Sequence, residues 1–118
     1  MRWYRPVLLV PVVALALVGI ARAAGPSPDA ISGVKTLADH EAIAEAYESE
    51  AKELSAKASS HQEMGKRYAR TPIYQKMPHA NVGMETHCDK LVSSLEESAA
   101  QAKALAASHR ELAKEASK

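Results

Sequence analysis

Two long stretches of the chain repeat small or apolar residues at alternating intervals of three and four positions. This period of 3.5 residues is typical of helices that pack lengthwise against one another. The first line consists of Leu37, His40, Ala44, Tyr47, Ala51, Leu54, Ala58, His61, Gly65 and Tyr68. The second consists of Met84, Cys88, Leu91, Leu95, Ser98, Ala102, Leu105, His109 and Leu112. A flanking apolar line holds Ile43, Ala46, Val92, Ala99, Ala106 and Ala113. The pattern predicts an all-α protein whose two long helices bury the first two lines.

The helix ends are marked by local signals. Thr36 and Asp39 have the spacing of a capping box, which predicts a first helix from 37 to about 69. Two prolines interrupt the pattern within 70–80, the predicted connection. Asn81 is the expected N-cap of a second helix that runs from about 81 to 116. Because the connection is short, we expect the helices to fold back as an antiparallel hairpin.

The polar residues of the two lines suggest a register. In an antiparallel hairpin, the position numbers of facing residues have a constant sum. A sum of 149 places His40 opposite His109 and His61 opposite Cys88. A hydrogen-bonded histidine layer that sets the register is the favoured role of His40 and His109, and a second metal site is the alternative. The lines are rich in alanine, so one hairpin buries little area. We therefore expect a homodimer that forms a four-helix bundle, with a monomeric hairpin as the alternative.

The N-terminal segment has the order of a secretory signal. Two arginines precede an apolar run over 7–20, and small residues at 21 and 23 suit a signal peptidase. The run is shorter than the ~20 residues that span a bilayer, although an uncleaved anchor is the alternative. We predict a signal peptide at 1–23 and a flexible leader at 24–35. The protein is then periplasmic or secreted, with no stable membrane insertion after cleavage.

Net charge narrows the choice of partners. Residues 1–23 carry three of the 15 Lys and Arg residues and no Asp or Glu. Residues 24–118 therefore carry 12 basic and 14 acidic residues, which gives a net charge of −2 with histidine neutral. Nucleic-acid binding normally requires a basic excess. The composition therefore does not support nucleic acid as a partner.

Sulfur and imidazole side chains gather around the connection. The single cysteine, three of the five histidines and every methionine after the first lie within 28 residues: His61, Met64, Met77, His79, Met84, His87 and Cys88. Thiolate, thioether and imidazole together favour copper, with zinc as the alternative.

The spacing within this group predicts a metal site between the helices. Cys88, His61 and Met84 are the predicted ligands, with His87 and Met64 as auxiliary ones. His61 and Met64 are three apart, and Met84 is four before Cys88, so each pair shares a side of its helix. Met77 and His79 lie on the predicted connection, where they could close over the site or carry an ion to it.

Other interpretations stay open. Cys88 could be a small buried side chain without chemistry, or it could link two chains. The chain could also be a non-metal module whose alanine-rich faces dock a partner protein. Enzymatic activity has little support, because a Cys–His pair has no recognisable third group here, and no Cys-x-x-Cys-His run for a c-type haem exists. The favoured function is metal sequestration, delivery or electron transfer, with a protein metal donor or acceptor as partner.

The start of the second helix resembles a known group. Residues 84–91 read METHCDKL, and residues 104–109 read ALAASH. They are similar to small, exported, uncharacterised bacterial helical proteins with a Met-x-x-His-Cys motif and a later Leu-Ala-x-x-His. The resemblance covers mainly the second helix and implies export and a helical fold. No activity is established for that group, so it implies no function.

Overall fold

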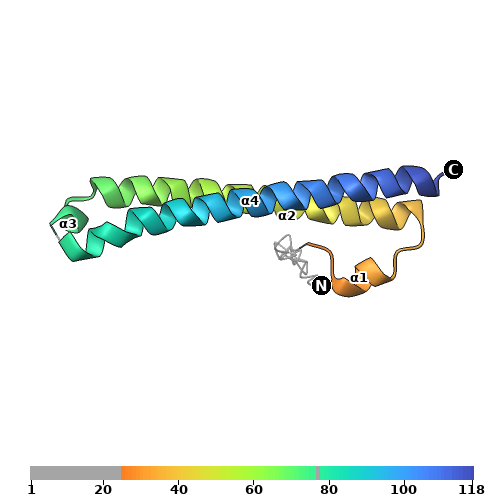
Figure 1. The fold of residues 1–118 in the computed structure, drawn as a ribbon, viewed down its shortest axis with the longest axis horizontal. Helices are drawn as coiled ribbons and strands as arrows, with labels where there is room; N and C mark the ends of the chain where they lie inside the picture. The colour runs from red at the N-terminus through yellow and green to blue at the C-terminus, as the bar shows by residue number, and fades with distance from the viewer. Residues whose placement is uncertain (1–24, 77) are drawn as a thin grey trace, which may run out of the picture.

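A computed structural model describes residues 25–76 and 78–118, with the side chains of 78–82 excepted. Over these ranges the elements are α1 (Pro28–Ser32), α2 (Leu37–Arg70), α3 (Pro72–Gln75) and α4 (Pro78–Ala116). Figure 1 shows α2 and α4 side by side and antiparallel, with α3 at the turn between them. The all-α hairpin is therefore confirmed. The predicted signal peptide at 1–23 lies outside the described residues.

The start of α2 follows the predicted capping box. The Asp39 backbone N–H donates to Oγ1 of Thr36 at 3.1 Å, and the Thr36 N–H donates to Oδ2 of Asp39 at 2.9 Å. The Lys35 N–H also donates to Oδ2 of Asp39, at 3.0 Å. This backbone bond from Lys35, followed by those from Thr36, lowers the pKa of the Asp39 carboxyl below its ordinary value.

The connection is shorter than the sequence predicts. α3 occupies part of it, and α4 begins at Pro78, so the prediction that Asn81 caps the second helix is wrong. Proline is well suited to a first helical turn, because its missing N–H would have no helical partner there. The helix therefore starts at the proline and includes Asn81.

The interior of the hairpin is lined by small residues. On α2, Ala44, Ala51, Ala58 and Gly65 are buried at intervals of seven. On α4, the described buried residues are Cys88, Ala99, Ala102, Ala106 and Ala113. No part of the described chain buries a large side chain completely.

The predicted interior of the second helix is partly wrong. Leu91, Leu105 and Leu112 are each 45% exposed, whereas the flanking line with Ala99, Ala106 and Ala113 is buried. The reason is steric: the small residues of α2 let the backbones approach closely, and only a small residue on α4 preserves that contact. A leucine in the same place would hold the helices apart.

The open end of the hairpin holds the predicted histidine layer. Nδ1 of His40 and Nδ1 of His109 are 3.1 Å apart, and the Tyr47 ring stacks on His109 with centroids 6.0 Å apart. Nearby, the Arg110 guanidinium on α4 donates to both carboxylate oxygens of Glu48 on α2. The expected hydrogen-bonded layer is confirmed, and it ties α2 to α4 at this end.

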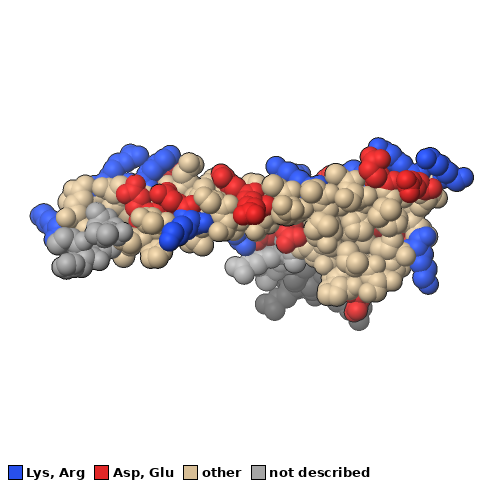
Figure 2. All heavy atoms as spheres, viewed as in Figure 1, with Lys and Arg blue, Asp and Glu red and all other residues tan. Residues whose placement is uncertain are grey.

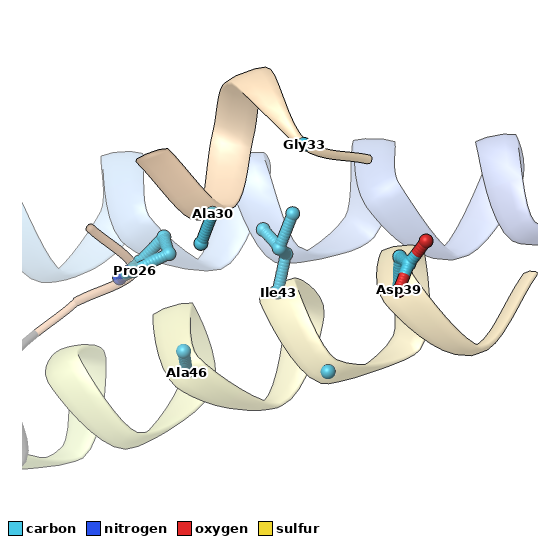
Figure 3. A pocket seen from close by; sticks show the side chains of 7 residues that line it. Pro26, Ala30, Gly33, Asp39, Ile43 and Ala46 are labelled. Carbon is cyan, nitrogen blue, oxygen red and sulfur yellow. The ribbon is translucent and has the colours of Figure 1, made fainter. Parts of the chain in front are cut away.

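The segment predicted as a leader contains α1 and lies against α2. Ser27 caps α1 by accepting from the Ala30 N–H at 3.1 Å. Figure 3 shows Pro26 and Ala30 facing Ile43 and Ala46 of α2 across a hollow of about 320 Å³. Ile43 is only 4% exposed. The lining of this hollow offers a single charged group, Asp39, which is already engaged in the cap.

Charge is distributed in both signs along the rod. Figure 2 shows Lys and Arg interspersed with Asp and Glu on the visible face. This face therefore offers no extended basic surface of the kind that binds nucleic acid. Over the ranges that the structure describes, no helix is both long enough and apolar enough to cross a membrane.

Candidate metal site

A hollow of about 240 Å³ lies between α2 and α4 near the connection. Its lining residues are His61, Met64, Tyr68, Met84, His87, Cys88 and Leu91. All five residues predicted from the sequence as metal ligands therefore line one hollow. The helical hairpin brings them together from positions up to 27 apart in the chain.

Both helices contribute an imidazole and a thioether as candidate ligands, and α4 adds the thiol. α2 supplies His61 and Met64, which are three residues apart and so lie on neighbouring turns. α4 supplies Met84, His87 and Cys88, at spacings that keep all three on one side. The site therefore depends on the relative position of two helices rather than on a loop.

The thiol lies where the two helices approach closely. Cys88 is free and 7% exposed. A Cβ placed on Gly65 would lie 3.2 Å from the Cβ of Cys88, so α4 fits here only because α2 has no side chain at 65. The predicted register placed Cys88 opposite His61, whereas its close contact in the structure is with position 65, and both Cys88 and His61 line the hollow.

His61 carries an unsatisfied polar atom. Its Nδ1 is buried and has no hydrogen-bond partner among the described residues. A buried donor or acceptor without a partner usually costs about 1–3 kcal/mol. Such an atom requires an explanation, and a metal ion or a proton donor from outside the chain would provide one.

Comparison with known proteins adds no relative. No family model, curated protein or solved structure matches the chain. The chemistry of the hollow must therefore be judged on its own residues.

The donor set limits what can bind. Over the described ranges, no three His, Cys, Asp or Glu side chains are arranged to hold a metal ion. A site in this hollow would thus need sulfur from Met84 or Met64 beside Cys88 and His61. Thioether sulfur is a soft ligand, which copper accepts more readily than zinc does.

One side of the hollow is open to solvent. Met64 is 37% exposed, and His87 is also exposed. These auxiliary residues lie at the mouth, while Cys88 lies at the floor. Met77 and the side chain of His79, which the sequence placed over the site, lie outside the described residues.

Two lining residues were not predicted as part of the site. Tyr68 is seven positions after His61, and Leu91 is seven after Met84, so the heptad spacing already placed them beside the ligands. The Tyr68 ring also packs edge-on against Tyr74 of α3, with centroids 5.1 Å apart. The turn therefore supports one wall of the hollow.

Proposed function

We propose that this protein is a periplasmic metal-binding protein that holds copper in the hollow lined by His61, Met84 and Cys88. The main support is Nδ1 of His61, which is buried without a hydrogen-bond partner among the described residues, while His61 lines a hollow that also contains a thiol and two thioethers. A bound metal ion would remove the cost of that unpaired nitrogen. Export through the signal peptide expected at 1–23 would place the site in the periplasm.

The ligand types favour Cu(I). Thiolate and thioether are soft ligands, and imidazole also suits copper. Zinc sites are commonly completed by Cys, His or carboxylate, and among the described residues no three such side chains are arranged to hold an ion. The exposed His87 and Met64 at the mouth give a protein donor or acceptor a route to the metal. This arrangement supports sequestration or delivery more directly than electron transfer.

Anaerobic titration of the exported chain with Cu(I) tests the proposal. We expect one copper per chain, with thiolate-to-copper absorption in the near ultraviolet and bound metal measured after dialysis. Cys88→Ala, His61→Ala and Met84→Ala should each lose most of the binding. His40→Ala, which removes an imidazole at the other end of the hairpin, is the matched control and should bind as the wild type does.

Two results would change the assignment. Copper bound equally well by the Cys88→Ala and His61→Ala chains would rule out this hollow. Zinc bound stoichiometrically, with no dependence on Met84, would make zinc the metal.

His61→Leu gives an independent signature. In the metal-free protein, this substitution removes an unsatisfied polar atom, so we expect a gain of about 1 kcal/mol in unfolding free energy. For a domain of this size, that gain corresponds to a rise in melting temperature of roughly 4–8 °C. The same variant should lose the further rise that copper produces in the wild type. A less stable metal-free His61→Leu chain would mean that Nδ1 has a partner.

The rivals make different predictions. A non-metal interaction module would show the same melting temperature with and without metal. A chain linked through Cys88 would run as a reducible doublet on a non-reducing gel, but the thiol is 7% exposed between two helices, so they would have to separate first. We also propose that the working unit is a homodimer, because seven of the nine buried hydrophobic residues in the described chain are alanines.

A further inference from the structure

We infer that two copies of this chain associate through one defined face of α4, which we call the leucine stripe. The stripe consists of Met84, Leu91, Ser98, Leu105 and Leu112, spaced seven residues apart. It lies beside the buried alanines of α4 (Ala99, Ala102, Ala106 and Ala113), which together with the small residues of α2 form what we call the alanine seam. Its three leucines are therefore each 45% exposed in the single hairpin. A heptad line of apolar residues beside an occupied seam is the pattern of a second packing face.

Hollows along the α2–α4 groove follow the stripe. One, of about 470 Å³, lies beside Leu105 and is also lined by Tyr47 and Leu54 of α2. The candidate metal site lies beside Leu91. Large side chains from another helix could fill such hollows, as in the packing of helix ridges into grooves.

The neighbouring residues have the composition of an interface. The outer side of the stripe is bordered by His87, Ser94, Gln101 and Ser108, all exposed and none carrying a fixed charge. Charged side chains lie further around the helix, and Glu50 and Glu97 border the groove. An apolar centre with little charge and a charged rim is the usual composition of a protein interface.

The sequence of the stripe favours a second copy over an unrelated partner. Ser98 is the midpoint, with leucines at equal distances on both sides. An antiparallel two-fold arrangement would thus place Leu91 of each copy against Leu105 of the other and the two Ser98 residues at the axis. A small residue fits there, because crossed helices approach most closely at their crossing point.

The area is sufficient for a stable dimer. The stripe extends ~42 Å along the helix axis at 1.5 Å per residue. Two helices side by side are ~20 Å wide, so each copy can bury ~800 Å². The total of ~1,600 Å² equals that of a standard-size specific interface.

Analytical ultracentrifugation of the exported, metal-free Cys88→Ser chain tests the association without involving copper. We expect the mass of a dimer, and Leu105→Glu should halve it while the circular dichroism stays helical. Ile73→Glu is the matched control, because Ile73 is 59% exposed but lies on α3, away from the stripe. A monomeric parent chain, or a Leu105→Glu chain that remains dimeric, overturns the inference.

Cysteine cross-linking in the same background tests the geometry. Ser98→Cys should form an intermolecular disulfide under mild oxidation, whereas Ser93→Cys, on the far side of α4, should not. Leu105→Cys should stay unlinked to itself, because its counterpart is Leu91 of the other copy. Equal cross-linking at 93 overturns the choice of face, and rapid cross-linking at 105 overturns the antiparallel order.

Discussion

Gly65→Ala has two opposing effects on stability, because it improves helix propensity but adds a methyl group at the close contact between α2 and α4. In a helix interior, alanine is more favourable than glycine by about 1 kcal/mol. At 65, however, the new Cβ would lie 3.2 Å from the Cβ of Cys88, closer than ordinary van der Waals contact. Because both atoms are attached directly to a backbone, neither can move aside unless a helix shifts.

The size of the steric cost decides whether Gly65→Ala raises or lowers the unfolding free energy. Forcing an extra methyl group into a packed contact typically costs about 1–3 kcal/mol. After the propensity gain, we expect Gly65→Ala to lower the unfolding free energy by about 0–2 kcal/mol. Gly83→Ala is the matched control on α4, since among the described side chains its Cβ would meet the His87 ring at the ordinary contact distance of 3.4 Å. That variant should gain up to about 1 kcal/mol.

Urea unfolding followed by circular dichroism measures both variants in the absence of metal. A third chain, Gly65→Ala in a Cys88→Gly background, removes the opposing Cβ, so the alanine should there become stabilising. If Gly65→Ala stabilises the wild-type chain as much as Gly83→Ala does, the close approach of the helices at Cys88 is wrong. The position of the thiol in the candidate site would then be wrong as well.

Three further predictions concern the open end of the hairpin. A double-mutant cycle on Glu48→Gln and Arg110→Gln should give a coupling of about 0.5–1 kcal/mol that falls with added salt, because the pair is bidentate but exposed; zero coupling at low salt would contradict it. The contact between Nδ1 of His40 and Nδ1 of His109, 3.1 Å apart, joins α2 to α4, so a double-mutant cycle on His40→Phe and His109→Phe should give a favourable coupling of about 1 kcal/mol, and zero coupling would contradict it. Because the pKa of the Asp39 carboxyl is lowered in the folded protein, this group adds stability at neutral pH that is lost as the pH falls through its folded-state pKa. An acid unfolding curve that is the same in the Asp39→Asn chain as in the wild type would refute this.

Local signals in the sequence predicted local structure well. The Thr36 and Asp39 spacing placed the start of α2 at Leu37, because a capping box involves only residues within one turn. The start of α4 was missed because two local signals competed: Asn81 is a good N-cap, but Pro78 is equally suited to a first turn. α1 was not predicted although Ser27, Pro28 and Asp29 form a local start signal, because a five-residue helix is marginal on its own and the surrounding glycines and prolines indicated a flexible leader.

Heptad periodicity left the choice between two interior lines open. Leu91 and Leu105 lie on one line, while Ala99 and Ala106 lie on the next, and both have the same period. Side-chain size favours the leucines, but the alanines and Gly65 of α2 allow a closer approach that leucine would prevent. Only the geometry of both helices together decides this, which is why the sequence alone placed the leucines inside.

The grouping of the candidate site residues was easier to predict than the interior line of α4, because it depends only on where the chain turns back. All five predicted ligands lie within two or three turns of the connection, so any hairpin brings His61 and Cys88 to the same end. The unpaired Nδ1 of His61 was not foreseeable, because burial of one ring atom depends on the rotation of both helices.

The alanine seam links the two proposals. Because small residues fill the contact between α2 and α4, the thiol of Cys88 is held against α2 and beside His61 rather than outside the groove. The same rotation of α4 turns Leu91 and Leu105 outward, where a single hairpin leaves them 45% exposed. A leucine seam would have buried those side chains and held α4 further from α2 at Cys88. The rotation that positions the ligand cluster therefore also creates the apolar face that a second copy can cover.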